Sequence, residues 1–254
     1  MTDINTAAER MFAALTAHEL KPLLSTEETL TLDDAYAIQK LLVKRLMSVE
    51  AKGGFKAALS NPGAQANVGA EEPVFGVLLS EGAVHPGAII ANHEFHRAVV
   101  ETEIGYRIGQ AVSSPVTEET VWDHIDQVMP MIELADPGFA SGGRMTASDL
   151  VAGNSAAAGF ITGAAADRPA SLDDFPVRLL RDGEQVSEGS GADAMGSQAF
   201  AVCWLINKAV SEGYILEPGH ILMTGSLGQP QPALSGDYVG DFGDFGRIEF
   251  TIEG

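Results

Sequence analysis

From Gly54 onward, the chain consists mostly of short strand-like segments separated by Gly, Pro and Asn, and this pattern restricts the fold more than any other feature. Short apolar segments bounded by turn residues are typical of strands rather than helices. Between two of them, Asp182-Gly183 predicts a tight hairpin, because that turn requires positive φ angles. We expect strands near residues 54–59, 74–79, 95–108, 129–135, 175–181, 184–188, 219–224 and 245–252. The sequence therefore predicts a sheet-rich body.

Helices are expected mainly ahead of this body. Residues 4–19 carry apolar positions at helical spacing, and Pro22 closes them. A second helix begins at Thr31, which can cap it, and ends at Gly53-Gly54. Three further helices are expected inside the body: a short one after Asn61-Pro62, one near 117–128, and a long one near 196–212.

These patterns divide the chain into a helical N-terminal lobe, residues 1–53, and a strand-rich body, residues 54–254, and predict the α+β fold class. A chain of 254 residues is long enough for one large domain with a full core. No repeat or low-complexity linker separates the two parts, so we expect them to pack closely.

The charge balance bears on the class of partner. A net charge of −20 repels phosphate backbones and anionic membranes, so we expect no nucleic acid and no membrane partner. No apolar run reaches the roughly 18 residues that a membrane span needs, and no signal peptide precedes the first helix. We therefore expect a cytoplasmic protein.

Three acidic residues in apolar, strand-like segments form the candidate site. Glu101 and Glu103 lie in AVVETEIGYRI, where alternation puts both side chains on one face, about 7 Å apart along the strand. Glu133 lies in MPMIELAD, where an unpaired charge would cost several kcal/mol. Hard oxygen ligands without a nearby cysteine favour Mg²⁺, or Mn²⁺, over zinc. The alternative is a solvated strand face on which Glu101 and Glu103 pair with Arg97 and Arg107.

Several segments together resemble the 2-keto-4-pentenoate hydratase and 4-oxalocrotonate decarboxylase family, within the fumarylacetoacetate hydrolase superfamily. They occur in the family's order and are residues 32–39 (LDDAYAIQ), 54–56 (GFK), 73–78 (PVFGVL), 100–104 (VETEI), 132–136 (IELAD) and 224–227 (TGSL). The resemblance implies a mixed β-roll body with a small helical N-terminal lobe, and a homo-oligomer, with a complex with a neighbouring pathway enzyme left open. It also implies that Glu101, Glu103 and Glu133 are ligands of Mg²⁺.

Lys56 is the first candidate catalytic residue. It lies in the apolar run GFKAAL, where an ammonium needs an anionic partner or a depressed pKa, unless it extends to solvent. Similar enzymes carry a lysine in this Gly-aromatic-Lys context, near the substrate and its proton transfers.

Three residues are candidates for holding the substrate. Ser226 and Leu227 follow an apolar strand and begin a Gly-rich bend, whose hydroxyl and backbone N–H groups could bind a carboxylate. Asn154 could support the pocket, or could simply be a turn residue.

Position 74 departs from the family pattern. Where relatives often read Pro-Asp-Phe-Gly, this chain has Val74, so an acid/base carboxylate is missing there. Glu72 is a candidate catalytic substitute. Residues 156–158 and Ala58 also differ from what relatives carry.

These features predict a metal-dependent hydratase, a lyase that adds water to a 2-hydroxy-2,4-dienoate or 2-oxo-enoate in the catabolism of aromatic compounds. Mg²⁺ would chelate the 1-carboxylate and 2-oxygen of this small acid, and Lys56 would relay a proton. Three alternatives stay open: a decarboxylase of a 2-oxo diacid such as 4-oxalocrotonate, an acylpyruvate hydrolase, and a non-catalytic partner subunit.

Overall fold

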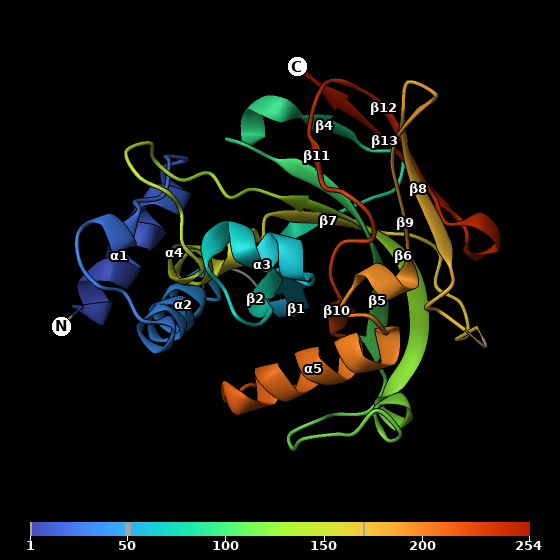
Figure 1. Ribbon diagram of the computed structural model, residues 1–254, viewed down its shortest axis with the longest axis horizontal. Helices are drawn as coiled ribbons and strands as arrows, with labels where there is room; N and C mark the ends of the chain where they lie inside the picture. The colour runs from blue at the N-terminus through green and yellow to red at the C-terminus, as the bar shows by residue number, and fades with distance from the viewer. Residues whose placement is uncertain (1, 49–51, 170) are drawn as a thin grey trace.

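The computed structural model describes residues 2–48, 52–169 and 171–254, with a helical group on one side and strongly curved sheets on the other (Figure 1). The helices are α1 (Ile4–Thr16), α2 (Leu32–Leu46), α3 (Pro62–Val68), α4 (Ala147–Ala152) and α5 (Gln198–Ser211). The strands are β1 (Lys52–Ala58), β2 (Val74–Leu79), β3 (Ala83–Val84), β4 (Ile89–Ala91), β5 (Val99–Ile108), β6 (Ile125–Ala135), β7 (Gly159–Thr162), β8 (Pro176–Arg181), β9 (Glu184–Ser190), β10 (Ile221–Met223), β11 (Gln231–Pro232), β12 (Gly236–Asp241) and β13 (Arg247–Glu253). The α+β class is confirmed.

Capping residues fix where the N-terminal helices begin. The Asp3 side chain accepts two backbone N–H groups at the start of α1, and Thr31 forms a capping box with Asp34 at the start of α2. The second helix ends at Leu46, earlier than the predicted Gly53-Gly54, and the part of that prediction on residues 49–51 lies outside the described residues. None of the helices that the structure describes is long and apolar enough to cross a lipid bilayer.

The N-terminal helices do not stand alone, because α4 from the later part of the chain packs against α2. Figure 1 shows α1, α2 and α4 together, with α3 between them and the sheets. The division into residues 1–53 and 54–254 stays a prediction, and residues 1 and 49–51 of it lie outside the described part of the chain.

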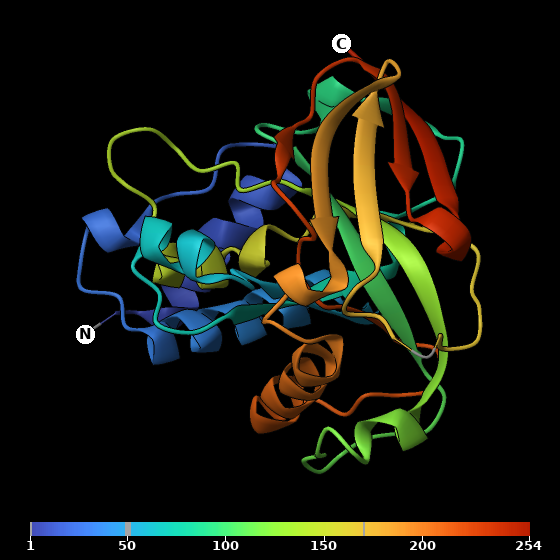
Figure 2. The same ribbon diagram turned by 45° about the vertical axis from the view of Figure 1, so that its right-hand side comes forward.

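The strands form two mixed sheets. The eight-stranded sheet has the order β2-β1-β10-β5-β6-β7-β3, with β11 also paired to β5, and the five-stranded sheet has the order β4-β13-β12-β8-β9. Most pairs are antiparallel, but β1 with β10, β3 with β7 and β4 with β13 are parallel. Figure 2 shows the five-stranded sheet in front of the long strands β5 and β6. The body is therefore built around the pairing of β5 with β6.

The Asp182-Gly183 hairpin between β8 and β9 is confirmed, with φ of 53° and 81° at the two residues. The predicted helix near 117–128 is wrong, because only Val121–His124 forms a short 3₁₀ turn and β6 begins at Ile125. Val121, Ile125 and Val128 recur at helical spacing, but pairing of the last two with β5 overrides that local pattern. The short strands β3, β4, β7, β11 and β12 and helix α4 were not predicted.

Candidate metal centre

The pairing of β5 with β6 places the three predicted carboxylates on one face of the sheet. Glu101 lies directly opposite Glu133, and Glu103 lies two residues further along β5, opposite Met131. Side chains two residues apart on a strand share a face, and directly paired residues of antiparallel strands also share one. The register therefore gathers side chains that are about thirty residues apart in the sequence.

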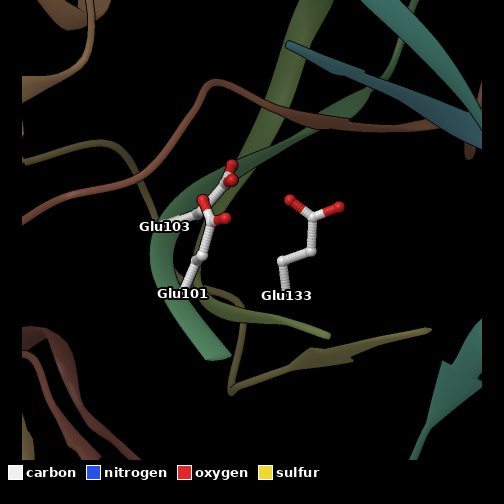
Figure 3. Close-up of side chains that lie close together, drawn as sticks. All are labelled: Glu101, Glu103 and Glu133. Atoms are coloured by element: carbon white, nitrogen blue, oxygen red, sulfur yellow. The ribbon is translucent and has the colours of Figure 1, made fainter. Parts of the chain in front are cut away.

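The three carboxylate groups project toward a common space, Glu101 and Glu103 side by side and Glu133 facing them (Figure 3). One oxygen from each lies within 4.8 Å of the other two. Glu103 and Glu133 are 0% and 1% exposed and Glu101 is half-buried, so the solvated strand face that the alternative interpretation assumed is wrong for Glu103. In the described part of the chain, no other group of three Asp, Glu, His or Cys side chains is close enough to hold an ion.

The surface pairing that the alternative interpretation proposed for Arg107 is wrong. Its guanidinium binds Asp126 across the β5–β6 pair instead, with an Nη2–Oδ2 distance of 2.8 Å. Both of these side chains are substantially exposed. The positive charge of Arg107 therefore does not neutralise Glu101 or Glu103.

Lys56 supplies the positive charge that lies closest to the cluster. The residue is 2% exposed on β1, and its Nζ donates a hydrogen bond to Glu133 Oε1. Burial by itself lowers the pKa of Lys56, but attraction by Glu133, Glu101 and Glu103 outweighs it, and the pKa is raised above the ordinary 10.5. The sequence left open whether this lysine has an anionic partner, and the structure gives it one.

One ammonium does not balance three carboxylates. Burial and the neighbouring charge of Glu133 raise the pKa of Glu101 from 4.5 to about 7, against the opposing effects of Lys56 and a hydrogen bond from Ser226. Burial, Glu133 and Glu101 likewise raise the pKa of Glu103 well above its ordinary value. The cluster has a surplus of negative charge that a divalent cation would neutralise.

Unsatisfied oxygen atoms also fit a cation. Glu103 Oε2 accepts the N–H of Gly225 at 2.7 Å, but Glu103 Oε1 and Glu133 Oε2 are buried without a hydrogen-bond partner. A buried oxygen without a partner is costly, and buried carboxylates are otherwise paired or bound to metals. Three carboxylates without sulfur or imidazole suit a hard cation that prefers oxygen.

A cavity of about 420 Å³ adjoins this cluster, and its lining includes Lys56, Glu101 and Ser226. The rest of the lining comes from β1 and the residues after it, from α3, from the first residue of β5 and the last of β6, from the segments that follow β6, and from the residue before β11. Apart from these three, the lining residues are Ala57, Ala58, Leu59, Ser60, Asn61, Ala64, Asn67, Val68, Val99, Ala135, Pro137, Met145, Leu150, Ser155, Ala156 and Pro230. The cavity is large enough for a small organic acid.

The structure places the three predicted substrate-binding residues differently. Ser226 lines the cavity, whereas Leu227 is 1% exposed and its N–H donates to the Thr102 carbonyl at 2.8 Å. Asn154 acts on β2, because its side-chain amide exchanges two hydrogen bonds of 2.9 Å with the backbone of Val77. Asn154 thus supports a neighbouring strand and is not part of the cavity lining.

Glu72 is not brought to the cluster. It is exposed and borders a separate cavity together with Leu32, Glu71 and Ser148. Val74 is fully buried on β2, paired with Ala58. Among the described lining residues, Lys56 and Glu101 are therefore the only ones with an ionisable side chain.

Two features of the cavity wall were missed by reasoning from sequence. Ser60 lines the cavity and is 4% exposed, and Ser155 lies in a left-handed turn with φ of 52°. Two glycines in the sequence could have indicated these close contacts. A Cβ at Gly225 would lie 2.3 Å from Ser60 Cβ, and one at Gly76 would lie 3.1 Å from Ser155 Cβ. Gly76 lies inside the apolar strand β2, where a glycine often marks such a close approach, whereas Gly225 follows β10 with φ of 115°.

Comparisons with known proteins agree with this geometry. Residues 50–253 match the family model described as "Fumarylacetoacetate (FAA) hydrolase C-terminal". The chain is 30% identical over 236 residues to a 2-keto-4-pentenoate hydratase of Paraburkholderia xenovorans (strain LB400), covering 91% of this chain and 87% of that one. It is 31% identical over 233 residues to a 2-oxo-hept-4-ene-1,7-dioate hydratase of Escherichia coli, covering 86% of each.

A solved structure shares the whole fold. The 4-oxalocrotonate decarboxylase of Pseudomonas putida G7, complexed with magnesium and adipate, superposes with a TM-score of 0.92 at 23% identity, over 100% of this chain and 99% of that one. The mixed β-roll architecture with a helical N-terminal part is confirmed.

Proposed function

Because the chain belongs to the fumarylacetoacetate hydrolase family, as its motifs predicted, we propose that it is a divalent-metal-dependent hydratase, a carbon–oxygen lyase acting on a 2-hydroxy-2,4-dienoate or 2-oxo-enoate in aromatic catabolism. The observation that carries this proposal is the cluster of three carboxylates within 4.8 Å of one another, beside a cavity that Lys56 also lines. The hydratase relatives cover most of the chain, so the proposal extends to the whole of it.

Glu101, Glu103 and Glu133 would hold the cation, and Mg²⁺ or Mn²⁺ fits their oxygen-only donor set. The cation supplies Lewis-acid polarisation of the substrate's 1-carboxylate and 2-oxygen, which stabilises enolate-like charge. The two buried oxygens that lack partners, Glu103 Oε1 and Glu133 Oε2, support this assignment.

Lys56 is the proposed proton carrier. Its Nζ holds a proton against Glu133 Oε1 and lines the same cavity as the substrate. During ketonisation, that proton can pass from Nζ to C5 while Lys56 takes up the proton of the 2-hydroxyl, and Glu133 keeps the lysine side chain oriented. Water then adds across the C3–C4 double bond, which is conjugated with the 2-oxo group, with its hydroxyl at C4 and its hydrogen at C3, giving a 4-hydroxy-2-oxo acid.

Two serines line the cavity beside these groups. Ser60 is 4% exposed, and we assign its hydroxyl to the substrate's carboxylate. Ser226 is 7% exposed and donates its hydroxyl hydrogen to Glu101, so we propose that it orients this ligand beside the substrate. The apolar lining around them limits the water that reaches the reacting carbons. A homo-oligomer, and contact with a neighbouring pathway enzyme, remain part of the proposal.

Decarboxylation of a 2-oxo diacid is the second candidate. It develops the same enolate-like charge but needs no base to activate water. The observation that favours it is the placement of Val74 and Glu72, because neither adds a carboxylate to the described lining.

Incubating the Mg²⁺-loaded protein with a panel of 2-hydroxydienoates and 2-oxo diacids tests both candidates. We expect loss of the dienoate's ultraviolet absorbance without release of CO₂, and no reaction in the presence of a chelator. Release of CO₂ from a diacid would favour decarboxylation. No reaction with either class, in protein with confirmed bound metal, would contradict the proposal and leave the non-catalytic partner subunit.

A further inference from the structure

The cavity beside the carboxylates has few charged residues in its lining. Lys56 and Glu101 are the charged residues of the described lining, and Ser60 and Ser226 contribute hydroxyls. The remaining lining is dominated by side chains without polar atoms, from α3, β5, the end of β6 and the segments after it, and the residue before β11. These are Ala64, Val68, Val99, Ala135, Pro137, Met145, Leu150, Ala156 and Pro230.

Polar residues elsewhere in the lining are neutral or already engaged. Asn61 Oδ1 accepts the N–H of Ala64 as the cap of α3, and Ser155 Oγ donates to the Phe75 carbonyl at 2.8 Å. Asn67 offers a neutral amide. Among the described lining residues, Lys56 is the one cation, and its Nζ already binds Glu133.

Arg144 does not change this balance. It precedes Met145 in the chain, but it is exposed and is not part of the cavity lining. Its guanidinium Nε donates to the Asn67 carbonyl at 3.1 Å, near the C-terminal end of α3. This contact joins α3 to the loop before α4 and leaves the inner wall without a second positive charge.

We propose that this site takes acids whose chain beyond the 2-oxo group is short, neutral and apolar, and that it rejects analogues with a second carboxylate at that end. The inference rests on the proposed function, which places the first carboxylate beside Lys56 and the three clustered carboxylates. A second carboxylate would then lose its hydration among apolar side chains with no cation to pair with, which is costly. The net charge of −20 adds long-range repulsion of a dianion.

Sequence similarity does not decide whether the substrate has one carboxylate or two. The E. coli relative, named for a 1,7-dioate, and the Paraburkholderia relative, named for a pentenoate, are 31% and 30% identical to this chain. The side chains of the cavity wall therefore distinguish acids with one carboxylate from acids with two, which overall sequence identity does not. It also counts against the second candidate function, because a decarboxylase substrate of this type is a diacid.

Calorimetry with unreactive acids tests the inference without turnover. The Mg²⁺-loaded protein would be titrated with 2-oxohexanoate and with 2-oxohexanedioate, which share the 2-oxo acid end and differ in a methyl or a carboxylate at C6. We expect the monoacid to bind at least about a hundredfold more tightly, since an unpaired buried carboxylate costs several kcal/mol. Equal or tighter binding of the diacid would overturn the inference and leave the proposed function intact. Binding of neither acid would overturn the proposed function, and this inference with it.

A single substitution in the wall sharpens the test. Met145 is half-buried and lines the cavity, so Met145→Arg would add a cation at low risk to the fold. We expect this variant to bind 2-oxohexanedioate at least about tenfold more tightly than the wild-type protein does, with no gain for 2-oxohexanoate. Met145→Gln is the matched control, with a polar side chain but no charge. An equal gain in both variants, or no selective gain in Met145→Arg, would count against the charge-based explanation.

Discussion

The two sheets of this protein differ in how deeply they bury charged side chains. On β13 of the five-stranded sheet, buried and more exposed residues alternate, so that one face meets the core and the other meets water. On β5 and β6 of the eight-stranded sheet, long stretches are buried on both faces, and Glu103 and Glu133 lie inside those stretches. On an alternating strand, the charged side chains stay in water and lose no hydration. The charged side chains of β5 and β6 are buried and therefore need partners.

One ion pair from each sheet makes the contrast specific. Arg178 and Asp241 on β8 and β12 are 2.7 Å apart, with side chains 54% and 17% exposed. Lys56 and Glu133 have side chains only 3% and 1% exposed. Exposed pairs typically contribute about 0–1 kcal/mol, whereas removing one partner of a buried pair costs about 3–5 kcal/mol. The charges of the eight-stranded sheet therefore depend on their buried partners, whereas those of the five-stranded sheet are solvated.

The largest expected effect is loss of metal binding in the double variant Glu101→Gln, Glu103→Gln. Two of the three proposed ligands lose their charge with little change in volume, so calorimetry should detect no binding of Mg²⁺ or Mn²⁺. The metal-free variant should melt no lower than metal-free wild-type protein, because the substitutions relieve repulsion among buried carboxylates. Asp241→Asn is the control on the other sheet and should leave metal binding unchanged. Wild-type affinity in the double variant would show that the ion site lies elsewhere.

Lys56→Met is expected to lower kcat by roughly a hundredfold to ten-thousandfold, the range typical of a general acid or base. The metal should still bind, because all three carboxylates remain. Stability of the metal-free form should fall by up to about 3–5 kcal/mol, since Glu133 loses its buried partner, and Mg²⁺ should restore part of it.

Both quantities would be measured on one preparation of Lys56→Met, with Arg178→Met as the matched control. Turnover within twofold of wild type would contradict the catalytic role of Lys56. Loss of metal binding would instead mean that Lys56 shapes the site.

The acidic cluster also predicts a pH dependence of stability in metal-free protein. Glu101 has an ordinary pKa of 4.5 and a folded-state pKa of about 7, so between these values the folded protein holds a proton that the unfolded chain releases. The unfolded state binds fewer protons in this window, and the free energy of unfolding therefore falls as the pH rises, by about 3 kcal/mol at most.

Urea unfolding with a chelator at several pH values between 5 and 8 measures this slope. Glu101→Gln should reduce the slope and leave the part that comes from the raised pKa of Glu103, while Asp241→Asn should leave the slope unchanged. A slope that Glu101→Gln does not alter would assign the pH dependence to other groups.

The smallest effect is expected from Arg178→Gln. Its pair with Asp241 is exposed and screened by salt, so the free energy of unfolding should change by less than about 1 kcal/mol, and turnover should not change. Denaturant unfolding at low and high salt checks this. If Arg178→Gln cost as much stability as Lys56→Met, burial would not be what distinguishes the two sheets.

Local sequence was enough for much of the architecture. Alternation in AVVETEIGYRI put Glu101 and Glu103 on one face, and Asp182-Gly183 specified a hairpin, because a strand's period and a turn's φ angles depend on adjacent residues. The apolar surroundings of Glu133 suggested that it joins the Glu101–Glu103 pair, and the motif resemblance supported this grouping. Where a pattern suited two structures, as in residues 117–128, local spacing led to the wrong one.

What only the tertiary structure decided depends on contacts between distant residues. The register that sets Glu101 opposite Glu133, and the hydrogen bond from Lys56 to Glu133, join segments that no local pattern relates. The placement of Glu72 in a separate cavity depends on the path of the chain after α3. The raised pKa of Glu101 arises from burial and from neighbouring charge, and both exist only after β5 and β6 have paired. The sequence by itself determined the candidate residues and the faces of the strands on which they lie, and long-range packing determined which of them meet, because charge and solvation depend on neighbours in space.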